Sequence, residues 1–211
     1  MNRIPIIISK AALLAGIISS VSTASAVGLS SDSATLLGKS YFGATLDYVD
    51  THKASLRGAK GPSLFINQPV AENIDVSAEY SYDYARIRPT SRKMKDHDFF
   101  TDGTYIFKRQ GAQPYVRGGF GRSLVYVPGP NQHASLYRAE AGVELPLGRA
   151  ASLTPYVRYT DGFRSRVNDT FEGGVLTHVP LSHNVSLIAR VTRSNDKNNA
   201  FSVGMVFPFR R

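Results

Sequence analysis

Hydrophobic and polar positions alternate along the C-terminal end of the chain. Apolar side chains take every second position there: Phe201, Val203, Met205, Phe207 and Phe209. The positions between them are Ser202, Gly204 and Val206, with Pro208 before the final Phe. Because successive side chains of a β-strand point to opposite faces, one face of this segment is wholly apolar and the other is small. The pattern predicts a strand with lipid on one side and a packed or wet interior on the other.

The same alternation recurs upstream. Nine further segments carry it: residues 40–49, 62–68, 73–85, 97–108, 113–127, 135–147, 152–163, 169–181 and 184–194. No segment keeps the 3.6-residue apolar spacing of an amphipathic helix over a helical length. The pattern therefore predicts a mature chain of strands and turns, with ten strands, or eight if the weak segment 62–68 and one neighbour are not strands.

The connections between these segments alternate in length. Short ones are expected at 68–73, 109–112, 146–151 and 180–184, and longer, more polar ones at 50–61, 86–96, 128–134, 164–168 and 195–198. Short turns on one side and longer loops on the other are typical of outer-membrane barrels. We therefore expect an all-β fold, a transmembrane antiparallel up-and-down β-barrel. Its longer loops would be extracellular and both termini periplasmic, which requires an even number of strands.

The N-terminus has the three parts of a secretory signal peptide. Arg3 and Lys10 are basic, residues 11–18 are apolar, and Ala24-Ser25-Ala26 is a small-residue cleavage site. The apolar run is too short for a transmembrane helix. We expect cleavage after Ala26, a short periplasmic segment over residues 27–39 and a barrel over residues 40–211, located in the bacterial outer membrane.

The chain is basic, with a formal net charge of +9. Since an exported chain does not normally meet nucleic acid, outer-membrane lipids with anionic head groups are the expected partners. Five basic residues crowd the expected extracellular loop 86–96: Arg86, Arg88, Arg92, Lys93 and Lys95. This loop either contacts the phosphates of lipopolysaccharide or is simply a solvated polar loop, and the sequence leaves both interpretations open.

The polar faces of the strands would line the lumen. The expected lumen charges are of mixed sign: Glu79, Asp102, Arg117, Arg138, Glu140, Glu144, Arg158, Glu172 and Arg190. Buried charges persist only when they are paired and hydrogen-bonded, so we expect these arginines to pair with the acidic residues. A barrel of eight to ten strands is only just wide enough for side chains, which favours a mostly filled lumen over an arginine-lined pore.

Two motifs resemble a known family. Residues 139–147 (AEAGVELPL) and 152–159 (SLTPYVRY) are similar to the strands before and after a turn in the small porin-like outer-membrane β-barrel family, which includes opacity proteins and OmpA-type transmembrane domains. The C-terminal strand resembles that family's closing strand, which typically ends in Phe, although Arg210 and Arg211 follow Phe209 here. The resemblance implies a barrel inserted by the outer-membrane assembly machinery, and it implies no substrate.

The sequence offers few catalytic candidates. His97 lies between Asp96 and Asp98, but adjacent strand residues point to opposite faces. Ser194-Asn195 resembles the Ser-Asn of barrel lipid A deacylases, yet Thr192 stands where those enzymes have a His. The chain has no Cys, and we expect no catalytic set, metal or cofactor. The favoured function is a structural or interaction barrel; the alternatives are a narrow porin-like channel for small solutes and a lipid A-modifying or proteolytic enzyme.

Overall fold

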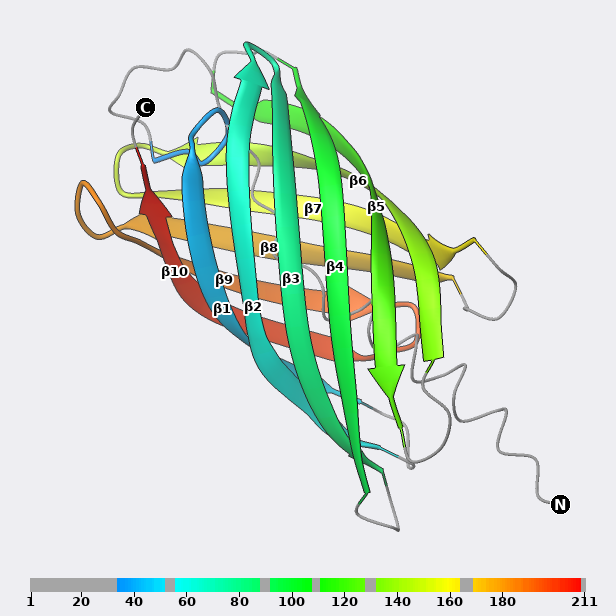
Figure 1. Ribbon diagram of the computed structural model, residues 1–211. Helices are drawn as coiled ribbons and strands as arrows, with labels where there is room; N and C mark the ends of the chain where they lie inside the picture. Colours follow the sequence, from blue (N-terminus) through cyan, green and yellow to red (C-terminus); the bar gives the residue numbers. More distant parts are fainter. Residues whose placement is uncertain are drawn as a thin grey trace, which may run out of the picture.

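The structure is a computed structural model, and it describes residues 34–51, 56–87, 92–107, 111–127, 132–163 and 169–209. The expected signal peptide therefore lies outside the described residues. Figure 1 shows a single barrel of long, tilted strands. The described part of the chain contains no helix long and apolar enough to cross a membrane.

Ten antiparallel strands close into the barrel. They are β1 (Tyr41–Asp50), β2 (Leu56–Ala71), β3 (Ile74–Ile87), β4 (Arg92–Ile106), β5 (Gln113–Tyr126), β6 (Gln132–Leu147), β7 (Ala151–Gly162), β8 (Thr170–Pro180), β9 (Ser186–Ser194) and β10 (Asn199–Pro208). Each strand pairs with its neighbours in sequence, which is the up-and-down order. The all-β, ten-strand barrel expected from the alternation is confirmed, and the eight-strand alternative is wrong.

The C-terminal strand closes the barrel. β10 pairs antiparallel with β1 over its whole length, from Asn199 opposite Asp50 to Pro208 opposite Tyr41. Phe209 follows the strand, and its backbone N–H donates to the Ser40 carbonyl at 3.0 Å. Closure leaves no strand edge with unpaired backbone groups, which lipid cannot satisfy.

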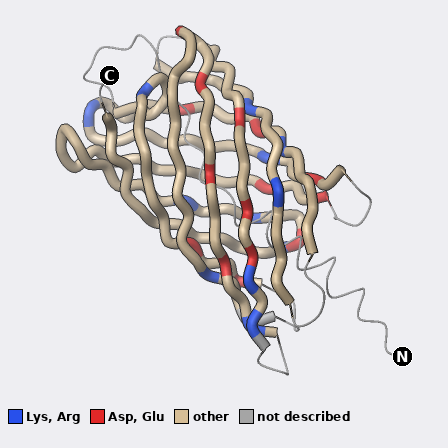
Figure 2. The backbone as a smooth tube through the Cα atoms, viewed as in Figure 1, with Lys and Arg blue, Asp and Glu red and all other residues tan. Residues whose placement is uncertain are grey.

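The barrel is apolar outside and polar inside. Large apolar side chains cover the outer surface, and the most exposed, Leu46 and Phe120, are each 68% exposed. On the closing strand, Phe201, Val203 and Met205 point outward and are about half exposed. A continuous exposed apolar belt on a closed barrel is the surface that faces lipid. Figure 2 shows charged positions along the length of the strands as well as near their ends.

The second strand is longer than the sequence suggested. β2 runs from Leu56 to Ala71 and takes in residues expected to form a loop. This stretch contains Gly58, Gly61 and Pro62, which are poor strand formers. It nevertheless lies between β1 and β3, which supply backbone partners on both sides, and β-bulges near Lys60 and Pro69 absorb the irregularity.

The expected basic loop 86–96 is likewise mostly strand. Arg86 lies at the end of β3, and Arg92, Lys93 and Lys95 lie at the start of β4. Arg88 is outside the described residues. The reason is pairing: residues 92–95 continue the β3–β4 ladder opposite residues 84–87. The side chains of Arg86, Lys93 and Lys95 are therefore placed by the sheet, which a loop assignment does not anticipate.

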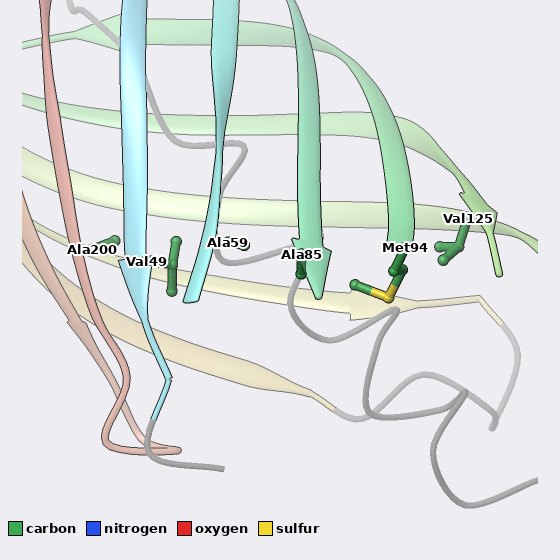
Figure 3. Close-up of a cluster of buried hydrophobic side chains, with 6 residues drawn as sticks. All are labelled: Val49, Ala59, Ala85, Met94, Val125 and Ala200. Carbon is green, nitrogen blue, oxygen red and sulfur yellow. The ribbon is translucent and has the colours of Figure 1, made fainter. Parts of the chain in front are cut away.

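The barrel has two ends. The terminal end is the one where β1 begins and β10 finishes, and the distal end is the opposite one. An apolar arc lines the inside near the distal end (Figure 3), and its members come from β10 and β1–β5: Val49, Ala59, Ala85, Met94, Val125 and Ala200. At the terminal end the described N-terminal segment, Ala34–Leu37, is fully buried.

Candidate functional site: the charged lumen

Inward-facing aromatic rings line the lumen beside glycines of neighbouring strands. Tyr115 of β5 is the register partner of Gly142 in β6, and Tyr156 of β7 is the partner of Gly174 in β8. A Cβ added to either glycine would lie 2.6 Å from the facing tyrosine oxygen. Two further pairs have the same form: Phe100 with Gly121, and Phe65 with Gly43. Glycine therefore makes the space in which each ring lies against the barrel wall.

Arginine guanidinium groups stack on three of these rings, Phe100, Tyr115 and Tyr156, and form a layer inside the barrel. The Arg138 guanidinium carbon lies 4.1 Å from the centroid of Phe100. Arg158 and Arg190 both lie over Tyr156, at 5.2 and 5.4 Å. Arg117 lies 5.5 Å from the centroid of Tyr115. Stacking on an aromatic face suits the planar guanidinium better than an ammonium group, which fits the choice of arginine over lysine here.

Three arginines of this layer, Arg117, Arg138 and Arg158, are ion-paired inside the barrel. Arg138 donates from Nε to Asp102 at 2.7 Å and from a terminal nitrogen to Glu79 at 2.8 Å, and it also pairs with the second Asp102 oxygen. Because two carboxylates from β3 and β4 share one guanidinium on β6, the contact spans four consecutive strands inside the lumen and not only one strand pair. The mixed-sign interior is thus organised into specific pairs.

Glu140 is the centre of the second set of pairs. It accepts from Arg158 Nε at 2.7 Å, from Arg117 at 3.2 Å and from the Tyr115 hydroxyl at 2.8 Å. Arg158 also pairs with Glu172 at 2.9 Å. We call the charged residues of both sets, together with Arg190 stacked on Tyr156, the arginine layer. Its members are Arg117, Arg138, Arg158, Arg190, Glu79, Asp102, Glu140 and Glu172.

Glu144 lies apart from the arginine layer. Its two carboxylate oxygens accept from the backbone N–H groups of Leu36 and Leu37, at 2.9 and 3.1 Å, and from Ser152 Oγ at 2.7 Å. The acid therefore holds the N-terminal segment in the terminal end of the lumen. The sequence had grouped Glu144 with the arginines, because alternation gives the face of a residue but not its depth.

Further contacts fix this N-terminal segment. His178 Nδ1 lies 2.8 Å from the Ala34 carbonyl, and Asn67 donates to the Lys39 carbonyl at 3.1 Å. Leu36 packs in a buried cluster with Phe65 and Ile188, among others. Residues 34–39 lack alternation, so the sequence placed them only in a short periplasmic segment and did not predict their contacts inside the barrel. In the sequence, the one indication of such a contact is His178, which lies on the inward face of its strand near a short turn.

Four acidic side chains form a separate acidic layer inside the barrel, on the distal side of the arginine layer. It consists of Asp47, Asp83, Asp96 and Asp98, all buried. Ser63 donates to Asp47 at 2.5 Å, and Ser123 donates to Asp96 at 3.1 Å. Asp83, Asp96 and Asp98 each keep one carboxyl oxygen without a hydrogen-bond donor among the described residues. The acidic layer is therefore less completely hydrogen-bonded than the arginine layer.

The catalytic candidates do not assemble. Asp96 and Asp98 point into the lumen, whereas His97 points outward and its Nδ1 lies 2.8 Å from the Tyr80 hydroxyl. Thr192 lies 2.7 Å from the Tyr156 hydroxyl inside the barrel. Within the described ranges no group of three or more His, Asp or Glu side chains is arranged to hold a metal ion.

Known proteins resemble this chain in fold. No family model matches, and no curated protein sequence matches. Among solved structures, the translocator domain of the autotransporter NalP from Neisseria meningitidis aligns with a TM-score of 0.50 and 12% identity, covering 81% of this chain and 88% of that one. An outer-membrane channel from Pseudomonas putida F1 aligns with a TM-score of 0.51 and 9% identity, covering 87% and 100%. The chain therefore has the fold of bacterial outer-membrane β-barrels, the class that its strand motifs resemble.

Proposed function

We propose that this protein is an integral outer-membrane barrel of the structural or interaction type, with a lumen closed by its own side chains. The ion pairs of the arginine layer carry the proposal. The side chains of Arg117 and Glu140 are 0% and 1% exposed, and those of Arg158 and Glu172 are each 1% exposed. Groups that line an open aqueous pore would be solvated instead.

The geometry at both ends agrees with closure. The N-terminal segment fills the terminal end, where Leu36 and Leu37 are 2% and 0% exposed. The apolar arc covers part of the distal end. Breaking a buried ion pair typically costs about 3–5 kcal/mol, so the arginine layer resists spontaneous opening. Interactions with the envelope would then use the outer wall and the loops, not transport through the lumen.

Conductance in planar lipid bilayers tests this proposal. We expect the folded protein to give no stable single-channel current. A gel that compares heated and unheated samples verifies that the barrel is folded before each recording. A stable, large conductance from the folded protein would overturn the closed-lumen proposal and leave the outer-membrane barrel intact.

The acidic layer favours a narrow, cation-selective channel as a second candidate. Its four carboxyl groups are buried inside the barrel, where a permeating cation would pass them. If small currents appear, a salt gradient across the bilayer distinguishes the candidates. A channel that uses this layer would prefer cations, and Asp83→Asn with Asp98→Asn would weaken the preference. The enzymatic alternative draws no support from the described residues, because His97 faces away from both neighbouring carboxylates.

A further inference from the structure

A row of alternating lysines and tyrosines crosses the outside of the barrel near its distal end. The strand register places Lys60 of β2 opposite Tyr84 of β3, Tyr84 opposite Lys95 of β4, and Lys95 opposite Tyr126 of β5. All four side chains are on the outward face of their strands. The Lys60 ammonium lies 5.4 Å from the centroid of the Tyr84 ring. Four strands therefore present one continuous basic and aromatic row.

A second basic pair lies just distal to this row. Arg86 of β3 is the register partner of Lys93 of β4, and both side chains are exposed. We call Lys60, Arg86, Lys93 and Lys95 the basic face. Within the described side chains of β2–β5, no Asp or Glu points outward, so these four strands carry no acid on the same face. The outward acid that lies beside them is Asp50, at the distal end of the adjacent strand β1.

Aromatic rings flank the basic face on the side toward the membrane centre. His97 lies 4.9 Å from Tyr82 and 5.5 Å from Tyr126 between ring centroids, and Tyr80 hydrogen-bonds to the same His97 ring. Amphipathic rings of this kind lie at the level of the lipid head groups. The cations immediately beyond them therefore lie at the depth of head-group phosphates.

We propose that the basic face binds the phosphate groups of lipopolysaccharide in the outer leaflet. The inference rests on the proposed outer-membrane location, which puts the distal end on the cell exterior. If these residues formed only a solvated basic loop, neither the adjacent rows of aromatic rings nor a fixed spacing between the cations would be expected. Here the sheet fixes the cations on one wall, and lateral attraction to a phosphorylated glycolipid follows from their charge and depth.

The adjoining wall over β6 and β7 carries a different group, so the basic face is confined to one side of the barrel. On β7 the outward Asp161 accepts from the Tyr137 hydroxyl at 2.9 Å and from the Tyr159 hydroxyl at 3.2 Å. The aromatic group there surrounds an acid instead of lysines. Arg193, exposed on the outward face of β9 near the same end, lies outside the basic face and provides a control.

The test measures binding of diphosphorylated lipid A to the detergent-purified barrel by native mass spectrometry. The triple variant Lys60→Gln, Lys93→Gln, Lys95→Gln is expected to lose at least about tenfold in affinity, since each basic residue near a charged lipid surface contributes about 1 kcal/mol. Arg193→Gln is expected to bind as the unmodified protein does. Lipid A stripped of both phosphates should bind equally weakly to all three proteins, and inorganic phosphate should not compete at millimolar concentration if the site requires the lipid.

Four outcomes would overturn the proposal: equal binding of phosphorylated and dephosphorylated lipid A, an unchanged affinity in the triple variant, an equal loss in Arg193→Gln, or displacement of lipid A by inorganic phosphate. If the triple variant does not fold, Lys95→Gln alone replaces it, with a loss of about fivefold expected from one such contact. Displacement of lipid A by inorganic phosphate would identify a simple anion site and contradict lipid recognition. Because binding is measured in detergent, its failure is separate from any result on conductance or location.

Discussion

Glu140 concentrates the electrostatics of the lumen in one side chain. Three donors converge on it, two of them guanidinium groups whose side chains are at most 1% exposed. Such a carboxylate is stable in the interior only because its partners compensate for the water that it has lost. The buried guanidinium groups of Arg117 and Arg158 depend in the same way on the charge of Glu140.

Replacing Glu140 by Gln keeps the shape of the side chain and removes its charge. We expect the variant to lower the free energy of unfolding by about 3–5 kcal/mol, because two buried guanidinium groups lose a counter-charge. Urea titration of the barrel in lipid vesicles measures the loss. Asp169→Asn, at an exposed carboxylate, is the control and should change stability by no more than about 0.5 kcal/mol. Equal behaviour of the two variants would show that the arginine layer contributes nothing to stability.

At the scale of the element, the aromatic–glycine pairs join neighbouring strands into a wall that can carry the arginine layer. Each pair consists of a ring on one strand and a glycine directly opposite on the next. Glycine is needed at Gly142 because of close approach, since the Tyr115 ring occupies the space of a Cβ. Tyr115 in that position also donates to Glu140, which links the wall to the ion pairs.

Gly142→Ala is therefore expected to destabilise the barrel by about 1–3 kcal/mol through overpacking against Tyr115. Gly103→Ala is the matched control, because a Cβ at that outward position meets nothing within 4 Å. Thermal or urea unfolding of both variants provides the comparison. A loss at Gly103 as large as that at Gly142 would indicate a general intolerance of alanine in these strands instead of a specific contact.

The N-terminal segment is the other element with a testable role. Its backbone is held by a charged acceptor, Glu144, through the N–H groups of Leu36 and Leu37. Hydrogen bonds to charged groups contribute about 1.5–3 kcal/mol, compared with about 0.5–1.5 kcal/mol for neutral ones.

For Glu144→Gln we expect the amides of Leu36 and Leu37 to exchange with solvent about tenfold faster, because a neutral acceptor holds the segment less strongly. Hydrogen–deuterium exchange read by NMR measures this difference. The amides of β10 serve as internal reference and should be unaffected. Unchanged exchange at Leu36 and Leu37 would mean that other contacts, such as that of His178 with Ala34, are sufficient to hold the segment.

At the scale of the whole molecule, the barrel reverses the usual distribution of polar and apolar groups. Its outside is a belt of exposed apolar side chains, and its inside holds carboxylates and guanidinium groups. The apolar side chains of this fold are buried in lipid on the outside, while hydrogen bonds and ion pairs hold the interior together. An intact barrel of this kind is therefore expected only in the membrane to which export delivers it.

Export makes a prediction about the mature chain. We expect the protein isolated from outer membranes to begin at Val27, since Ala24-Ser25-Ala26 is the small-residue cleavage motif. Intact-mass measurement of the membrane-extracted protein tests this directly. A chain that keeps residues 1–26, or one recovered in the soluble fraction, would contradict the export prediction.

Period-two alternation determined much of this fold. It placed Phe201, Val203 and Met205 on the lipid side, and it placed Arg138 and Glu140 inside, because a strand offers only two faces. It failed where a strand lacks that pattern, as in residues 56–61 of β2, which are held in the sheet by their neighbours. It also misjudged the basic residues of 86–96, since a charged strand end looks like a loop in sequence.

The depth of each side chain in the lumen, and the residues that it contacts, were decided by the tertiary structure alone. Nothing in the sequence separates Glu144, which holds the N-terminal segment, from Glu140, which pairs with arginines, although both lie on the same face of β6. That distinction depends on strand tilt and on the register between strands distant in the chain, which fix the height of each side chain in the barrel. The sequence by itself determined which residues face lipid and which face the lumen; the closed sheet decided which of them meet.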